Sequence, residues 1–191
     1  VFRGAFSSVR VRLLVGGSFF PGARAIEKLK QPGATCAVHP AGKDALATII
    51  YTSGSTGAPK GVQYTHGMLA GQSEAIRAMF DIQPGEVGAA CFLPFALFFV
   101  AMGNCAVFPD MDFRFPAKAD PRKVLAALRG ATSANASPAL LEPFARFLVD
   151  TKTTLPGLTR VLTVGAPIRP KLHEDFLQCL PDGNVFTPYG A

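Results

Sequence analysis

Short apolar, β-branched runs alternate along this chain with segments of helical length, and this alternation limits the folds open to it. Strand-like runs occupy residues 45–51, 61–65, 87–95, 104–109, 159–165 and 184–190. Helical patterns occupy residues 66–80, 121–130, 138–150 and 169–180, and the second and third of them open on Asp120-Pro121 and Ser137-Pro138, an N-cap residue before a proline. Strands that alternate with helices build parallel sheets. The sequence therefore predicts an α/β fold with a mostly parallel sheet flanked by helices.

Length and composition favour a single packed unit. The chain has 191 residues, of which 49% are hydrophobic, and its mean hydropathy is +0.27. Such a composition predicts a buried core and argues against disorder. The longest apolar run, residues 91–103, is shorter than the roughly 18 residues that cross a bilayer and contains Pro94. We therefore expect no transmembrane segment. Because the sequence lacks an initiating Met, we also expect it to be part of a longer chain.

Cysteine spacing and charge exclude several classes of protein. The four cysteines are widely separated and form no C-x-x-C pair, which argues against a zinc site or a disulfide framework and favours the cytoplasm. The net charge is +6, but no aromatic residues interleave with the basic ones as they do in RNA-binding motifs. The charge would suit an anionic ligand or nucleic acid and by itself decides nothing, but the missing aromatic-basic motif leads us to predict no nucleic acid.

The segment from Thr52 to Gly61, TSGSTGAPKG, lies between two strand-like runs. It combines three glycines, four hydroxyl side chains and Lys60. Glycines let backbone N–H groups approach an anion closely, hydroxyls add donors and a ligand for Mg²⁺, and a lysine adds positive charge. The spacing is not that of the Walker A motif, because Lys60 follows Pro59 and precedes Gly61. A flexible linker is the alternative, but phosphate binding explains the pattern better.

The fold prediction brings three unusual loops together. The strand predicted at residues 45–51, interpreted as buried on both faces, precedes loop 52–61. Two further strands precede residues 165–167 and 189–191. Since the carboxyl ends of parallel strands lie at one edge of a sheet, we expect these loops to form one site there.

Three motifs carry a resemblance to a known family. YTSGSTGAPKGV at residues 51–62, VGAPI at 164–168 and PYGA at 188–191 resemble, in order and spacing, the adenylate-forming (AMP-dependent synthetase/ligase) superfamily. Within it, RLLVGGS, ADPRKV and SPALLEPFARF are most similar to the bacterial olefin β-lactone synthetases, which are acyl-CoA synthetase-like. Residues 93–103 also lack the histidine that is usual in CoA ligases. The resemblance implies that residues 1–191 form part of the large N-terminal AMP-binding (adenylation) domain, with the small C-terminal domain absent.

The resemblance further implies an ATP- and Mg²⁺-dependent ligase that activates a carboxylic acid as an acyl adenylate. The adenylate then closes to a β-lactone or is transferred to CoA. A long-chain or β-hydroxy fatty acid is the expected substrate, with other enzymes of the same pathway as partners. Thr56 and Lys60 are the implied catalytic residues, and Thr56 the implied metal ligand. The implied nucleotide-binding residues are Thr52, Ser53, Gly54, Ser55, Thr56, Gly57, Lys60, Gly165, Ala166, Pro167, Tyr189, Gly190 and Ala191. The candidate acyl-pocket residues are Phe92, Phe95, Leu97 and Phe98.

Two alternatives remain open at the level of sequence. The four candidate acyl-pocket residues are equally well explained as ordinary core at the end of a strand, since buried aromatic residues are common. A nucleotide- or acyl-binding module without chemistry is the alternative to an enzyme. Taken alone, the 191 residues are expected to be inactive, because the relatives' magnesium-binding glutamate and adenylation lysine lie outside them.

Overall fold

The structure is a computed structural model that describes residues 9–16, 21–29, 33, 35, 37–52 and 59–188. The chain divides into two compact units, residues 1–41 and residues 42–191. In the first unit, β1 (Leu13–Leu14) pairs in parallel with β2 (Arg24–Ala25), and a 3₁₀ helix follows at Ile26–Leu29. These short elements are held by few bonds, among them one from the Arg24 N–H to the Arg12 carbonyl at 2.9 Å.

The second unit begins with a hairpin that differs from the sequence prediction. β3 (Leu46–Thr52) pairs antiparallel with β4 (Lys60–Thr65), and together they form a separate two-stranded sheet. We expected the first of these strands to be buried on both faces, yet Ile49 is 44% and Tyr51 68% exposed. The β-branched run correctly marked a strand, but it could not report which neighbours cover that strand.

Helix α1 (His66–Met79) continues directly from β4, as the sequence predicts. Thr65 is its N-cap, with its hydroxyl oxygen accepting from the Met68 N–H at 3.2 Å. This bond satisfies one of the free N–H groups of the first turn and fixes where the helix begins.

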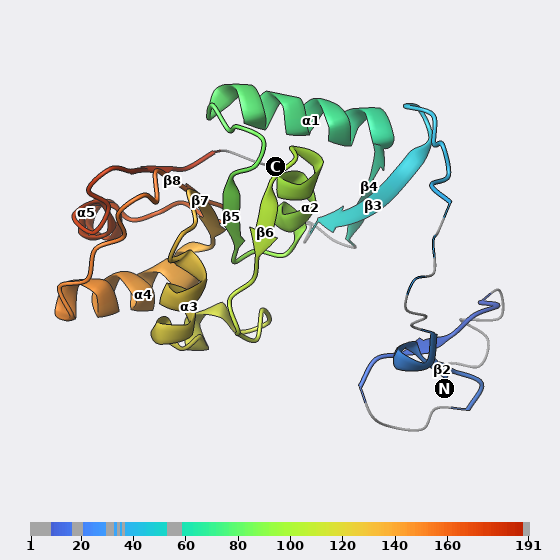
Figure 1. Cartoon of the computed structure of the whole chain (residues 1–191), viewed down its shortest axis with the longest axis horizontal. Coiled ribbons are helices and arrows are strands. Elements are labelled where there is room, and N and C mark those ends of the chain that lie inside the picture. Colours follow the sequence, from blue (N-terminus) through green and yellow to red (C-terminus); the bar gives the residue numbers. More distant parts are fainter. Residues whose placement is uncertain are drawn as a thin grey trace. The chain divides into compact units, whose positions relative to one another are not determined.

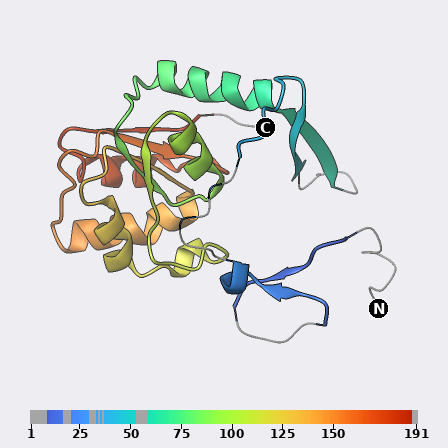
Figure 2. The same cartoon turned by 45° about the vertical axis from the view of Figure 1, so that its right-hand side comes forward.

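A five-stranded parallel sheet forms the centre of the second unit, in the order β6-β5-β7-β8-β9 (Figures 1 and 2). Its pairs are all parallel, which confirms the predicted fold class. The strands are β5 (Val87–Ala90), β6 (Cys105–Val107), β7 (Ser133–Ala136), β8 (Arg160–Thr163) and β9 (Asn184–Phe186).

Helices cover both faces of this sheet. The larger core cluster joins the sheet to α3 (Pro121–Leu128), α4 (Pro138–Asp150) and α5 (Pro170–Leu177). A smaller cluster joins β5 to α2 (Pro94–Ala101), and a 3₁₀ turn occupies Pro116–Lys118. The Asp120 carboxylate accepts from the Arg122 N–H at 2.9 Å, which confirms the predicted start of α3. Among the described residues, no helix is long and apolar enough to cross a membrane.

Parts of the sheet differ from the prediction, and the final strand, predicted at residues 184–190, ends at Phe186. The strand predicted at residues 87–95 ends at Ala90, and a helix begins at Pro94, because proline suits the first turn of a helix and cannot donate to a sheet. The central strand β7 was not predicted. Its sequence, Ser-Ala-Asn-Ala, contains no β-branched or aromatic residue.

Close packing of α2 on β5 depends on Gly88. A Cβ atom placed on Gly88 would lie 2.6 Å from three ring carbons of Phe99, which is itself only 1% exposed. The ring therefore rests directly on the strand backbone, and this contact sets how closely α2 approaches the sheet.

A polar network joins three strands at their amino ends. Glu86, which precedes β5, accepts from the Thr132 hydroxyl at 2.8 Å and forms an ion pair with Arg160 at the start of β8. Burial by itself raises the pKa of Glu86, but the Gln83 N–H, Thr132 and Arg160 donate to the carboxylate and hold its pKa below the usual value. The ionised carboxylate is therefore favoured in the folded state.

Candidate functional site

A cavity of about 430 Å³ lies between α1, α2 and the carboxyl ends of β8 and β9. This is the edge of a parallel sheet at which ligands usually bind. Its lining carries no ionisable side chain, and Gln72 is the one polar side chain among the described lining residues. The lining residues are Gln72, Ala75, Ile76, Met79, Phe80, Phe95, Phe98, Leu162, Val164, Gly165 and Pro188.

Helix α1 supplies one wall, which the sequence prediction missed. Ala75, Ile76 and Met79 recur at helical spacing, a pattern usually typical of a packed core. Met79 is nevertheless 73% exposed, so this stripe borders an open cavity. The end of α1 is tied to the sheet by Phe80 and Phe186, whose ring centroids lie 5.1 Å apart in an edge-to-face arrangement.

A row of aromatic side chains on α2 and its preceding turn supplies the opposite wall. The ring centroids of Phe92 and Phe95 lie 6.2 Å apart, and those of Phe95 and Phe98 lie 5.6 Å apart. Phe95 and Phe98, two of the candidate acyl-pocket residues, line the large cavity. Phe92 lines a second cavity of about 290 Å³ with Ser137 and five other residues.

Leu97 stands apart from the other predicted acyl-pocket residues. It is 76% exposed and does not line the large cavity. The structure therefore brings two of the four predicted side chains into the large cavity, places a third beside it and leaves Leu97 outside it. The sequence could not make this distinction, because it predicted a strand where a helix begins.

The segment after β8 reaches the cavity in the predicted place. The Val164 N–H donates to the Ala136 carbonyl at 3.0 Å, and the Thr163 hydroxyl donates to that of Thr187 at 3.1 Å. Gly165 then turns the chain with φ of 91°, a backbone conformation that favours glycine, and lines the cavity. Ala166 and Pro167 follow it in the exposed loop before α5.

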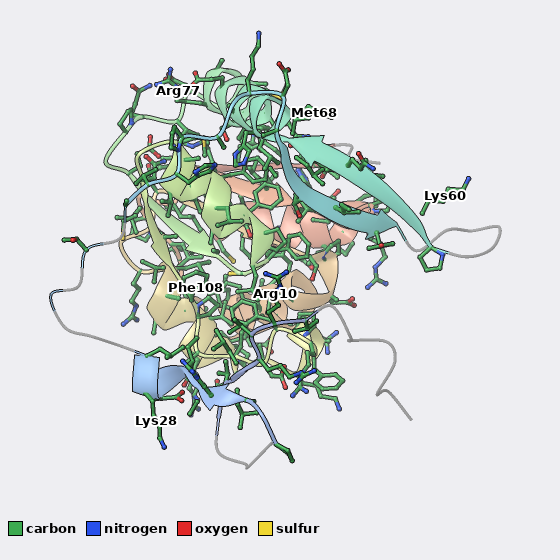
Figure 3. The ribbon with its side chains drawn as sticks, turned by 90° about the vertical axis from the view of Figure 1, so that its right-hand side faces the viewer. Arg10, Lys28, Lys60, Met68, Arg77 and Phe108 are labelled. Carbon is green, nitrogen blue, oxygen red and sulfur yellow. The ribbon has the colours of Figure 1, made fainter. Side chains whose placement is uncertain are left out.

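The predicted phosphate-binding loop joins β3 to β4. Ser53, Gly54, Ser55, Thr56 and Gly57 lie outside the described residues, as do Tyr189, Gly190 and Ala191. Thr52 ends β3 and Lys60 begins β4. Figure 3 shows the Lys60 side chain at the end of the hairpin, pointing away from the five-stranded sheet. The loop therefore connects antiparallel strands in a separate sheet, and our expectation that it follows a strand of the parallel sheet was wrong.

The described residues contain no cluster of three or more His, Cys, Asp or Glu side chains that could hold a metal ion. Thr56, the predicted Mg²⁺ ligand, is outside that range. The large cavity suits an apolar ligand, because the lining residues that the structure describes offer no charge to pair with a polar one.

The fold and motifs define a class of protein, and comparison with known families agrees with it. The family model described as AMP-binding enzyme matches residues 6–191, so the chain belongs to the AMP-binding enzyme family. It is 40% identical over its whole length to the olefin beta-lactone synthetase of Xanthomonas campestris pv. campestris. It is also 39% identical over its whole length to the olefin beta-lactone synthetase of Stenotrophomonas maltophilia. The chain covers 34% and 35% of these two proteins, about a third of their length.

Solved structures show the same fold. The N-terminal domain of FACL13 from Mycobacterium tuberculosis matches with a TM-score of 0.65 and 22% identity, covering 82% of this chain and 39% of that one. At this identity the likeness concerns the fold alone.

Proposed function

We propose that the full-length protein containing this chain uses ATP to activate a long aliphatic carboxylic acid, either a fatty acid or a β-hydroxy fatty acid. The carboxylate oxygen attacks the α-phosphorus of ATP, and pyrophosphate leaves as the acyl adenylate forms. One observation carries the substrate class: the described residues that line the 430 Å³ cavity beside Gly165 are mostly apolar, and none of them is ionisable. We assign residues 1–191 to the large adenylation domain of that protein, which the likeness to an N-terminal domain supports.

The positions of the family motifs assign roles to particular residues. Ser53, Gly54, Ser55, Thr56, Gly57 and Lys60 would hold the phosphates of ATP, with Thr56 as a ligand of Mg²⁺. The ion would supply positive charge to the phosphates during transfer. Gly165, Ala166 and Pro167 would line the adenine, and Tyr189 would stack on it. These roles rest on the motifs alone.

The second step distinguishes two branches. In a β-lactone synthetase, the substrate's β-hydroxyl oxygen attacks the acyl carbon, AMP leaves and a four-membered ring closes. In a CoA ligase, the thiol sulfur of CoA attacks instead and a thioester forms. We favour the β-lactone branch, because two proteins that match this chain over its whole length are named olefin beta-lactone synthetases.

The test is ATP–pyrophosphate exchange by the full-length protein with fatty, β-hydroxy fatty, aromatic and amino acids. We expect exchange with the first two classes and its loss in the Thr56→Ala/Lys60→Ala variant. Lys171→Ala is a matched control, since this exposed lysine on α5 pairs with Asp175 and lies outside the predicted loop.

Each outcome bears on one part of the proposal. Unchanged exchange in the double variant would refute the assignment of the loop. Preference for amino acids would refute the substrate class. Release of a β-lactone without CoA would select that branch, whereas a CoA thioester would select the ligase branch. ATP binding without exchange for any acid would support a binding module.

A further inference from the structure

The turn that starts α2 is held by a side chain from a different strand. β5 ends at Ala90 and α2 begins at Pro94, and the N-cap residue Leu93 makes no side-chain capping bond. The Phe92 N–H instead donates to the side-chain Oδ1 of Asn135 at 2.9 Å. The Cys91 N–H donates to the backbone carbonyl of Asn135 at 3.1 Å. Asn135 thus anchors the turn two residues before the helix from a position 43 residues further along the chain.

Asn135 is an unusual residue for its position. It lies in β7, the central strand of the sheet, and is 0% exposed. Its neighbours Ala134 and Ala136 belong to the core on the α3–α5 side, so Asn135 faces the side of α2, because side chains alternate along a strand. Its Nδ2 group has no hydrogen-bond partner among the described residues. An apolar residue would avoid burying that amide, but it would leave the Phe92 N–H without its acceptor.

The anchored turn determines where the aromatic row lies. Phe92 is the first member of the row, and Phe95 and Phe98 follow at helical spacing with centroid distances of 6.2 and 5.6 Å. Phe92 borders the smaller cavity, whereas Phe95 and Phe98 border the larger one. A shift of the turn therefore moves the wall between both cavities, and neither cavity is touched by Asn135 itself.

We propose that Asn135 is a positioning residue for acyl-chain selection: by accepting from the Phe92 N–H, it fixes the aromatic row on α2 and hence the shape of the apolar cavity. The inference rests on the proposed function, since it concerns the acid that the cavity admits. Asn135 acts through Phe92, Phe95 and Phe98 and does not contact the acid.

The experiment uses the full-length enzyme and acids of 8, 12 and 16 carbons. Asn135→Leu removes the acceptor while keeping the branch at Cγ, and Asn135→Ser removes it with a smaller side chain that leaves a polar group. Asn135→Asp keeps an oxygen at the Oδ1 position and is the rescue variant. Asn104→Leu is the matched control: Asn104 is 6% exposed, lies just beyond the other end of α2 and has no side-chain partner among the described residues.

For Asn135→Leu and Asn135→Ser, we expect the ratio of kcat/KM between the 8- and 16-carbon acids to change by about fivefold or more, because small displacements in a binding site have large effects on rate. The KM for ATP should stay within about twofold. Asn135→Asp and Asn104→Leu should keep the wild-type ratio. If Asn135→Leu does not fold, Asn135→Ser decides the question by the same ratio.

A purely structural role predicts a different result. It would lower the melting temperature and the active fraction equally for all acids, and an unchanged ratio in a folded Asn135 variant would overturn the proposal. Failure of the proposed function can be told apart from failure of the Asn135 proposal. In the first case the wild-type enzyme itself would form no adenylate with any of these acids.

Discussion

Replacing Gly88 with alanine tests how tightly α2 is held against the sheet. The added methyl carbon would lie 2.6 Å from three carbons of the Phe99 ring, whereas carbon atoms in contact normally lie about 3.5–4.0 Å apart. The ring must therefore retreat by about 1 Å, and as a 1% exposed residue it has no solvent-filled space to enter. Overpacking of this kind costs about 1–3 kcal/mol. We expect Gly88→Ala to lower the free energy of unfolding by about 2–3 kcal/mol.

Native-state hydrogen exchange on the full-length protein measures this loss of stability locally, because the amides of β5 and α2 report the free energy of opening those elements. Gly71→Ala is the control: Gly71 lies within α1 with nothing within 4 Å of its added Cβ, so alanine should stabilise the helix by up to about 1 kcal/mol. Phe99→Leu should recover part of the loss in the Gly88→Ala background, since residues in contact couple. Equal protection in Gly88→Ala and the wild type, or strict additivity with Phe99→Leu, would refute the packing argument.

Two further predictions concern ionisable groups. Glu86→Gln should destabilise the protein by about 1–2 kcal/mol at pH 7, because it leaves the Arg160 guanidinium half-buried without its carboxylate. The pKa of Glu86 is lowered on folding, so its contribution is complete above the unfolded pKa near 4.5 and is lost as the pH falls through the folded value. Urea unfolding at several pH values should therefore show the wild type and Glu86→Gln converging below pH 4.5, and a constant difference would contradict this reasoning. Burial raises the pKa of the Cys91 thiol to about 12, whereas Cys105 is exposed, so iodoacetamide at pH 8 should label Cys105 and spare Cys91 until denaturant is added. Mass spectrometry of the labelled peptides measures this, and rapid labelling of Cys91 in the native protein would show that the site opens.

Local signals in the sequence predicted much of the fold correctly. Thr65 and Asp120 mark helix starts because their side chains bond to N–H groups only two or three residues away. The parallel sheet followed from the alternation of strands and helices. What could not be predicted depended on distant neighbours: β3 has a typical strand sequence, yet among the described strands it pairs with β4 alone and stays exposed.

In the candidate site, too, features marked by a local motif could be predicted and features that depend on distant residues could not. Gly165 could be placed after a strand because its motif directly follows one, and it lines the large cavity, whereas its role at the adenine stays a prediction. The wall formed by α1 could not, because Ile76 and Met79 have the pattern of an ordinary buried helix face. The role of Asn135 also could not be predicted from the sequence, because its bond to Phe92 spans 43 residues and leaves no local pattern.

The polar network around Glu86 and the cavity beside Gly165 lie at opposite ends of the same parallel strands. A strand of four residues, such as β8, spans about 13 Å. Substitutions more than about 7–10 Å apart usually have additive effects on stability. Sequence changes that reshape the cavity can therefore accumulate without weakening the network that joins the strands, and a single scaffold can diverge toward different ligands while the contribution of that network to stability is retained.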